Sequence, residues 1–285
     1  MQHGLHLQVG DTHSACLVHT CPAAEQPSAA RPQNRFSGHG IVSCRSGLVI
    51  RRDPFTSRIR HRKVGTMKIG IIGAGNIGGN LTRRFTALGH DVAVANSRGP
   101  ETLAALAEET GATAVRSTEA ARGADVVVVT VPLKSVPGLP AGILDGAADG
   151  AVFIDTGNYY PQQRDGRIAA IEDGLTESRW TEQQLGRPMI KAFNGTYAQD
   201  ILDNAVPHGT PGRQALPVSG DDPAAKQVVR DLIDELGFDT VDAGGLDDSW
   251  RQQPGTPVYG NRGDVEAITK ALAEASPERT AEWRA

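Results

Sequence analysis

A glycine-rich turn after a short apolar run is the sequence feature that most restricts how this chain can fold. The sequence KIGIIGAGNIG starts at Lys68 and places Gly73, Gly75 and Gly78 in a G-x-G-x-x-G arrangement. The apolar run ends in glycine, as a buried parallel strand does, and apolar residues then recur every three or four positions over residues 76–88. The pattern predicts a strand, a tight turn and a helix in that order.

The same alternation of strands and helices continues along the chain. The run ADVVVVTVP is the strongest strand signal, and its lack of polar alternation predicts that both faces of the strand are covered. Strands that alternate with helices imply right-handed βαβ units, so we expect an α/β fold with a doubly wound, mostly parallel sheet of the Rossmann type. The other expected strands are HDVAVAN, residues 113–115, AVFIDTGN, PMIKAFN, QALPVSG and FDTVDAGG. The other expected helices span residues 100–109, 118–122, 223–236 and 264–275. Residues 276–285 are expected to form a fraying tail.

Residues 1–66 differ in composition from the rest of the chain. They hold nine Lys and Arg against three acids, a net charge of +6, so the other 219 residues carry −10 of the total −4. They are rich in Arg, Ser, Gly and Pro without apolar periodicity, which predicts a largely disordered extension. Two origins stay open. One is an organelle transit peptide, which is typically rich in Arg and Ser and poor in acids; the other, which we favour, is a stretch upstream of a true start at Met67.

The cysteines and histidines give little indication of metal or disulfide chemistry. All three cysteines and six of the eight histidines lie in residues 1–66, two of each in the stretch HSACLVHTC. Tetrahedral zinc sites usually draw on two separated pairs of ligands, so four candidate ligands this close together do not predict a metal site. We therefore expect no metal. The absence of cysteine after Cys44 is compatible with a reducing cytoplasm, where we expect the protein to act.

Charge and hydropathy argue against two classes of partner. A net charge of −4 argues against binding nucleic acid by bulk electrostatics. The sequence has no apolar run that approaches the roughly 18 residues of a membrane-spanning helix. A small molecule is the expected partner.

The context of the glycine turn predicts a dinucleotide site. Gly73 permits the tight turn, Gly75 lets the backbone approach a pyrophosphate, and Gly78 allows the helix to pack closely against the strand. The predicted helix offers free N–H groups and a partial positive charge to the phosphates at its N-terminus. A glycine-rich turn without a ligand is the alternative.

The residues after the second predicted strand discriminate between the two nicotinamide cofactors. A chain that binds NAD typically has an acid here, which accepts hydrogen bonds from the adenosine ribose. This chain has Asn96, Ser97 and Arg98 instead, starting 23 residues after Gly73. Asn96 does not repel a phosphate, Ser97 can donate a hydrogen bond, and Arg98 can add charge-assisted contacts. The stretch predicts NADP(H), the alternative being a solvated loop arginine.

Three later strands are expected to end at the same edge of the sheet, where the nicotinamide should lie. Thr130, Val131 and Pro132 follow the fourth strand, and Val131 and Pro132 are expected to form walls for the ring. Asn158 and Asn194 follow the next two strands. Either asparagine is a candidate for hydrogen bonding near the reacting carbons, or simply caps a turn or helix.

The region after residue 66 contains no arrangement typical of nucleophilic catalysis. It holds only His90 and His208 as histidines and no G-x-S-x-G sequence. A shortage of acid and base candidates suits direct hydride transfer, in which positioning of two rings does most of the work. We therefore predict no specific catalytic residue.

Several of these stretches together resemble a known family. The segment from Met67 to Tyr259 resembles the NADPH-dependent reductases of the deazaflavin coenzyme F-420, in the bacterial branch of predicted dinucleotide-binding oxidoreductases. Archaeal members lack the long SWRQQPGTP segment, in which Trp250, Arg251 and Gln252 either line a substrate cleft or close the C-terminal fold. They also tend to carry an aromatic residue where Leu133 stands. The stretches that carry the resemblance are MKIGIIGAGNIGGNL, ANSRGPETL, VPLKSVPGLP, DTGNYYP, KAFN and DAGGLDDSWRQQPGTPVYG.

The resemblance implies reversible hydride exchange between NADPH and a 5-deazaflavin such as coenzyme F-420, stacked in a cleft against a smaller C-terminal portion. It implies that Ser97 and Arg98 bind the adenosine 2′-phosphate, that Val131 and Pro132 flank the nicotinamide, and that the protein is a homodimer. The residues implied to hold the pyrophosphate are Gly73, Gly75, Asn76, Ile77 and Gly78.

We expect an NADP-binding domain over residues 67–194 and a smaller, substrate-side portion with a terminal tail over residues 195–285. Two other functions stay open. An imine or carbonyl reductase of the pyrroline-carboxylate reductase type usually builds its substrate site on a helical C-terminal dimerisation domain, whereas the residues after Asn194 still alternate between strand and helix. The second open function is that of an NADPH sensor without turnover. Hydride transfer requires no particular catalytic side chain, so the sequence does not distinguish such a sensor from an enzyme.

Overall fold

The structure is a computed structural model, and it describes residues 65–285. The predictions for the N-terminal extension and for the HSACLVHTC stretch lie outside the described residues. Within residues 65–285, no helix has the length and apolar character needed to cross a membrane.

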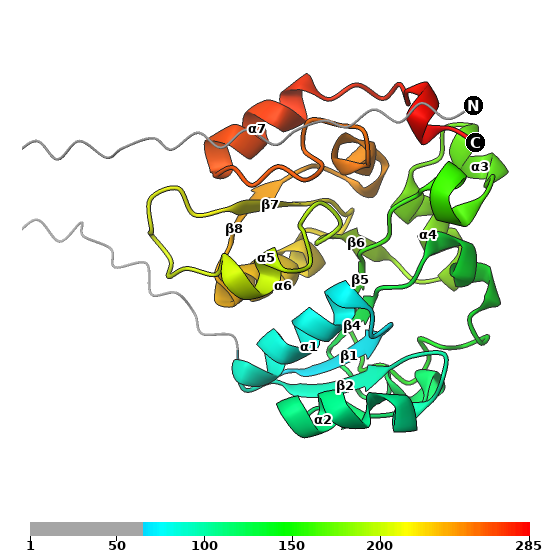
Figure 1. Cartoon of the computed structure of the whole chain (residues 1–285), viewed down its shortest axis with the longest axis vertical. Helices are drawn as coiled ribbons and strands as arrows, with labels where there is room; N and C mark the ends of the chain where they lie inside the picture. The colour runs from blue at the N-terminus through cyan, green and yellow to red at the C-terminus, as the bar shows by residue number, and fades with distance from the viewer. Residues whose placement is uncertain (1–64) are drawn as a thin grey trace, which may run out of the picture. The chain divides into compact units, whose positions relative to one another are not determined.

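A six-stranded sheet forms the centre of the described region (Figure 1). All of its neighbouring strands pair in parallel, in the order β3-β2-β1-β4-β5-β6. This order is that of a dinucleotide-binding Rossmann fold, and it confirms the predicted α/β class. The strands are β1 (Lys68–Ile72), β2 (Asp91–Ala95), β3 (Thr113–Ala114), β4 (Val126–Val129), β5 (Val152–Asp155) and β6 (Met189–Lys191).

Both faces of the central strands are buried, as the β-branched run of β4 predicts. Val126 and Val128 belong to one hydrophobic cluster, while Val127 and Val129 belong to a second cluster on the other side. Helices α1 and α6 cover the first face through residues such as Phe85. The helices are α1 (Asn76–Ala87), α2 (Ala104–Thr110), α3 (Ala169–Glu172), α4 (Glu177–Leu185), α5 (Asp200–Asp203), α6 (Pro223–Leu236) and α7 (Val265–Glu274).

Two predicted helices differ from the structure in detail. The one predicted over 100–109 begins with a 3-10 turn, Pro100–Leu103, before α2. The one predicted over 118–122 is only a 3-10 turn, Ser117–Glu119, because Gly123 soon turns the chain with a positive φ of 63°. Both segments still lie between strands, so the parallel topology is unaffected.

The last two strands do not extend the main sheet. β7 (Ala215–Val218) and β8 (Asp239–Asp242) pair in parallel as a separate two-stranded sheet. Helix α6 connects them and contacts both sheets, and α7 packs on the small one (Figure 1). A single antiparallel bridge between Lys191 and Ser219 links the small sheet to the edge of the large one.

The expectation of a fraying C-terminal tail is wrong. The tail ends in a 3-10 turn, Ala281–Trp283, close to α3 (Figure 1). Gln162 donates hydrogen bonds to two backbone carbonyls of the tail. Arg279 donates to the buried carboxylate of Glu177 at 2.8 Å, and the Trp283 ring lies 5.9 Å from that of Tyr160. These partners lie more than 100 residues upstream, so local sequence does not reveal them.

Candidate functional site

A cleft of about 390 Å³ opens at the carboxyl edge of the main sheet, next to the glycine turn. It brings together eight of the residues that the sequence singles out, which come from four separate segments. Gly73 and Gly78 belong to the turn and the start of α1 but lie outside the cleft lining, and so do residues 96–98, which follow β2. The predicted residues in the lining are Gly75, Asn76, Ile77, Thr130, Val131, Pro132, Asn158 and Asn194.

The geometry of the turn explains two of its three glycines. Gly73 has a φ of 112°, and a Cβ there would lie 2.1 Å from the carbonyl oxygen of Thr130. A Cβ on Gly78 would lie 1.9 Å from the carbonyl oxygen of Gly73, so only glycine lets α1 start this close to the turn. Gly75 has open space where a Cβ would be. The turn thus forms a backbone cradle at the start of α1, which fits a pyrophosphate.

The Asn96–Arg98 loop is organised by its own asparagine. The Asn96 Oδ1 accepts hydrogen bonds from the backbone N–H groups of Arg98 at 2.9 Å and Gly99 at 3.0 Å. Asn96 Nδ2 donates to Thr102 Oγ1 at 2.9 Å. Ser97 and Arg98 are exposed, and the Arg98 guanidinium has no hydrogen-bond or ion-pair partner within residues 65–285. Asn96 therefore shapes the loop, while Ser97 and Arg98 are free to bind an anion.

The two predicted asparagines bind each other. Asn158 Nδ2 donates to the Asn194 carbonyl at 2.8 Å, and Asn194 Nδ2 donates to Asn158 Oδ1 at 3.1 Å. Gln252 completes the network, since its carbonyl accepts from Asn194 Nδ2 at 2.7 Å and its Nε2 donates to Asn194 Oδ1 at 3.0 Å. Asn194 is buried and its amide is fully used, so it positions Asn158 at the cleft wall.

The SWRQQPGTP segment closes the C-terminal fold. Arg251 stacks over the Trp250 ring, with 4.5 Å from its Cζ to the ring centroid, and donates to the Leu272 carbonyl at 3.2 Å. Gln252 is buried and holds Asn194. All three residues lie outside the cleft lining. Of the two roles left open by the sequence, the structure thus supports the structural one.

Nine of the residues that line the cleft were not identified from the sequence, and four of them carry a phenol or a guanidinium. Tyr160 and Arg164 follow β5, Tyr197 precedes α5, and Tyr259 precedes α7. The Tyr160 and Tyr259 hydroxyls are hydrogen-bonded to each other. Tyr197 is 55% exposed, and the Arg262 guanidinium stacks on its ring with 4.6 Å from Cζ to the ring centroid. The motifs DTGNYYP and PGTPVYG contain two of these tyrosines, but only the fold shows that they meet.

A buried ionic network lies behind the cleft. Lys191 Nζ donates to Glu177 Oε2 at 3.2 Å and to the Gly157 carbonyl at 3.1 Å. Asp155 accepts from Ser178 Oγ at 2.6 Å and from the Gly157 N–H at 2.9 Å. Burial raises the pKa of Asp155, although the nearby Lys191 opposes that shift. The network fixes the backbone of Gly157, which directly precedes Asn158 in the cleft lining.

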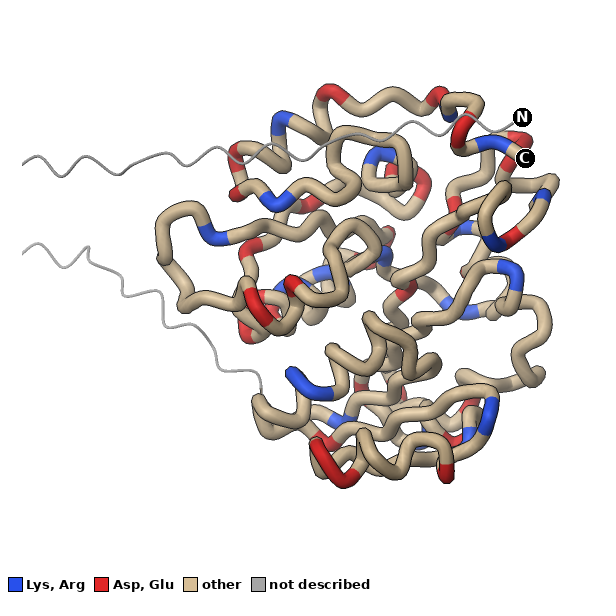
Figure 2. The backbone as a smooth tube through the Cα atoms, in the orientation of Figure 1, with Lys and Arg blue, Asp and Glu red and all other residues tan. Residues whose placement is uncertain are grey.

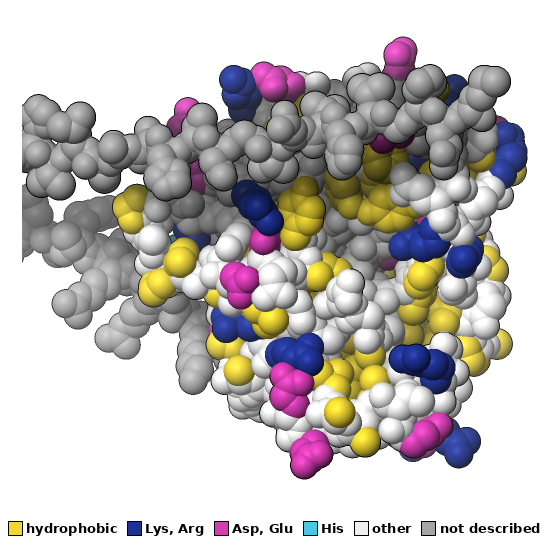
Figure 3. Space-filling view, in the orientation of Figure 1, with side chains coloured by type: hydrophobic (Ala, Val, Ile, Leu, Met, Phe, Trp, Pro, Cys, Tyr) yellow, Lys and Arg dark blue, Asp and Glu magenta, His cyan; other side chains and the backbone are white. Residues whose placement is uncertain are grey.

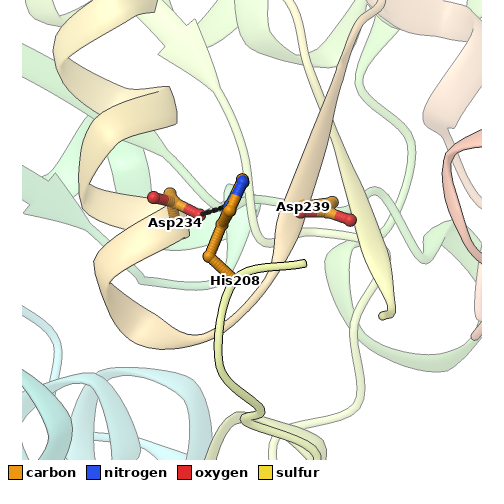
Figure 4. Close-up of side chains that lie close together, drawn as sticks. All are labelled: His208, Asp234 and Asp239. Atoms are coloured by element: carbon orange, nitrogen blue, oxygen red, sulfur yellow. Dashed lines mark hydrogen bonds and ion pairs between the residues drawn. The ribbon is translucent and has the colours of Figure 1, made fainter. Parts of the chain in front are cut away.

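A second polar cluster lies at the far side of the small sheet, where His208, Asp234 and Asp239 converge (Figure 4). The Arg213 guanidinium lies among them, 2.5 Å from Asp234 Oδ1 and 2.8 Å from Asp239 Oδ1. Burial opposes ionisation of Asp234, but the hydrogen bond from Arg213 lowers its pKa overall. The arginine supplies the positive charge between the two carboxylates, so the cluster is organised as an ion-pair network.

Charged residues of both signs are spread over the helices and loops (Figure 2). On the face shown in Figure 3, basic and acidic side chains are interspersed, with hydrophobic side chains between them. Such a surface suits a protein that binds a small molecule in a cleft rather than a polyanion over a broad face.

The fold and the cradle are those of a dinucleotide-binding protein, and comparison with known proteins identifies a family of NAD(P)-dependent oxidoreductases. The model described as "NADP oxidoreductase coenzyme F420-dependent" matches residues 68–159. A hypothetical protein, SMa0349, from Sinorhizobium meliloti is 32% identical with a TM-score of 0.58, over 69% of this chain and 94% of that one. The chain belongs to this F420-dependent NADP oxidoreductase family, which confirms the resemblance seen in the sequence.

Two further relatives are informative in a more limited way. A "putative f420 dependent nadp-reductase" from an Arthrobacter species has a similar fold, at 24% identity and a TM-score of 0.52, over 63% of this chain and 85% of that one. The Escherichia coli protein YjhV is 52% identical over 56 residues, which are 20% of this chain and 41% of YjhV. The chain spans less than half the length of the curated relatives that it matches.

Proposed function

We propose that the protein transfers a hydride between NADPH and a 5-deazaflavin. The observation that carries the proposal is the exposed Ser97–Arg98 pair at the end of β2, beside a glycine cradle that fits a pyrophosphate. A serine hydroxyl and an unpaired guanidinium suit the 2′-phosphate of NADPH, where an acid would repel it. The name of the family and that of the Arthrobacter structure support the deazaflavin.

The cleft supports a planar acceptor. Val131 and Pro132 form its wall at the end of β4, where the nicotinamide of a cofactor held by the cradle should lie. Tyr160, Tyr197 and Tyr259 line the same cleft and offer aromatic surface to a second ring. When bound, NADPH supplies the hydride from its nicotinamide C4. The chain's part is to hold the two rings face to face and to exclude water.

A reductase of a small cyclic imine is the second candidate function. Hydroxyl groups in the cleft favour it, because an imine nitrogen requires a proton donor. The C-terminal portion counts against it, since β7, β8, α6 and α7 form a small α/β unit instead of a helical dimerisation domain. An NADPH sensor without turnover is the third, and it predicts tight binding with no oxidation by any acceptor.

The proposal is tested by acceptor competition under steady-state conditions. The protein is mixed with NADPH and, in parallel, with a deazaflavin, a flavin mononucleotide or 1-pyrroline-5-carboxylate, while NADPH absorbance is followed. We expect rapid oxidation with the deazaflavin only. Preferential oxidation by the imine would support the second function instead, and binding of NADPH without turnover would support a sensor.

A further inference from the structure

Tyr160 and Tyr259 form a hydroxyl pair in the cleft. They come from segments 99 residues apart, and their hydroxyls are hydrogen-bonded to each other. Both side chains line the same cleft as Val131 and Pro132, and both are half-buried. The Arg164 guanidinium lies over the Tyr160 ring, 4.8 Å from its centroid, and the centroid of the Trp283 ring lies 5.9 Å from that of Tyr160. The fold thus holds this pair in a defined place.

The pair has one more proton than its internal hydrogen bond uses. Two phenols carry two O–H protons, and one of these lies between the two oxygens. Neither hydroxyl has another hydrogen-bond partner in the described part of the chain, so the second proton is available to a ligand in the cleft. Burial and the hydrogen bond with Tyr259 raise the pKa of Tyr160, so the Tyr160 hydroxyl keeps its proton at neutral pH.

We propose that the Tyr160–Tyr259 pair is the proton donor to the hydride acceptor. The inference rests on the proposed function and adds a requirement: the acceptor is a conjugated ring system whose nitrogen takes up a proton when its carbon takes up hydride. For a 5-deazaflavin, the C4–H bond of NADPH breaks and its electron pair forms the new C–H bond at C5. The displaced π electrons reach N1, which takes the tyrosine proton, and NADP⁺ is released.

The negative charge that the proton transfer leaves on the tyrosine pair is removed by a proton from solvent. Loss of the proton leaves one negative charge shared between two hydrogen-bonded oxygens, beside the Arg164 guanidinium, which is also paired with Asp165 at 2.9 Å. A proton from solvent at the open mouth of the cleft then restores the neutral pair. The net reaction consumes one NADPH, one deazaflavin and one proton, and it needs no other reactant.

Matched Tyr→Phe variants test this role. Tyr160→Phe, Tyr259→Phe and the double variant remove hydroxyls but keep the rings, while Tyr159→Phe is the control. Tyr159 is fully buried, and its hydroxyl bonds to Glu172 Oε1 at 3.0 Å and to the Ile168 N–H, away from the cleft. The hydride-transfer rate is measured in single turnovers with a deazaflavin, at several concentrations of a small buffer acid. Thermal melting and NADPH titration check folding and cofactor binding.

We expect the double variant to be slowed about 100-fold, within the usual range for loss of a general acid. Its rate should rise with the concentration of buffer acid, which would replace the missing donor, whereas the wild type and Tyr159→Phe should not respond. A double variant that folds, binds NADPH and transfers hydride at the rate of the wild type would overturn the role of the pair and leave the proposed function standing. A wild type that gives no transfer to the deazaflavin would overturn the proposed function itself.

Discussion

Replacing Arg98 with alanine isolates the contact that we assign to the 2′-phosphate of NADPH. The Arg98 guanidinium is exposed and has no hydrogen-bond or ion-pair partner in the described region, so its removal costs the fold little. The loop is held by Asn96, which binds the backbone N–H of residue 98 whatever its side chain is. Any loss of affinity is therefore a loss of contact with the ligand.

The expected magnitude follows from the kind of contact and its exposure. A hydrogen bond to a charged group contributes about 1.5–3 kcal/mol. Because Arg98 is exposed, solvent and salt screen its charge, so we expect the lower half of that range, about 1.5–2 kcal/mol. The Kd for NADPH should rise roughly 10- to 30-fold, since about 1.4 kcal/mol is a factor of ten. NADH lacks the phosphate, and its Kd should stay within about twofold.

Fluorescence titration of NADPH and NADH with the two proteins measures both constants. Arg122→Ala is a matched control, because Arg122 is also an exposed arginine but precedes β4 and so lies at the opposite edge of the sheet. The effect of Arg98→Ala should shrink at high salt. Equal losses for NADPH and NADH, or no loss for either, would refute the phosphate-binding role of Arg98.

Three further predictions concern the turn, the buried network and the arginine cluster. Gly78→Ala should lower the free energy of unfolding by about 1–3 kcal/mol and weaken NADPH binding, because its Cβ would overlap the Gly73 carbonyl oxygen. Gly79→Ala, whose Cβ would have Arg83 Nη1 as its nearest neighbour at 3.4 Å, should instead raise the free energy of unfolding by about 0.5–1 kcal/mol. Thermal or urea unfolding measures both, and a similar loss for the two variants would contradict the packing argument. Burial raises the pKa of Asp155 above its unfolded value, so its contribution to stability is fully present below pH about 4 and is lost as the pH rises through the folded-state pKa. Asp155→Asn, measured by urea unfolding at several pH values, should therefore gain stability relative to the wild type as the pH rises, and a pH-independent difference would count against it. Arg213→Met should lower the free energy of unfolding by roughly 3 kcal/mol, because it leaves two neighbouring carboxylates without their common cation. A chelator should leave the melting temperature of the wild type unchanged, and a fall in that temperature would point to a bound metal.

Much of the fold is predictable because its signals are local. The β-branched runs of the main sheet and the apolar periodicity of α1, α6 and α7 locate those elements within a few residues. Helix α4 was missed for a physical reason: the buried side of the helix includes Glu177, Ser178 and Thr181, so it shows no apolar stripe. Its burial depends on partners such as Lys191 and Arg279, which are distant in sequence.

The candidate site likewise has parts with a local sequence signal and parts that depend on contacts between distant residues. The glycine turn and the Asn96–Arg98 loop are each one continuous stretch of sequence, so a local pattern is enough to identify them. The Tyr160–Tyr259 pair joins positions 99 residues apart, and no local pattern indicates that they meet. The role of Gln252 in holding Asn194 likewise depends on how the C-terminal segment folds back on the sheet edge.

The most direct test of the account is to follow the hydride itself. The protein is mixed with a deazaflavin and NADPH deuterated at C4, with each C4 diastereomer in a separate reaction, and the reduced deazaflavin is analysed by mass spectrometry and NMR. The account predicts that one diastereomer delivers its deuterium to C5 and the other delivers hydrogen, because the cleft holds the two rings in one orientation. Reduced deazaflavin without deuterium from either diastereomer, or no reduction at all, would contradict direct hydride transfer.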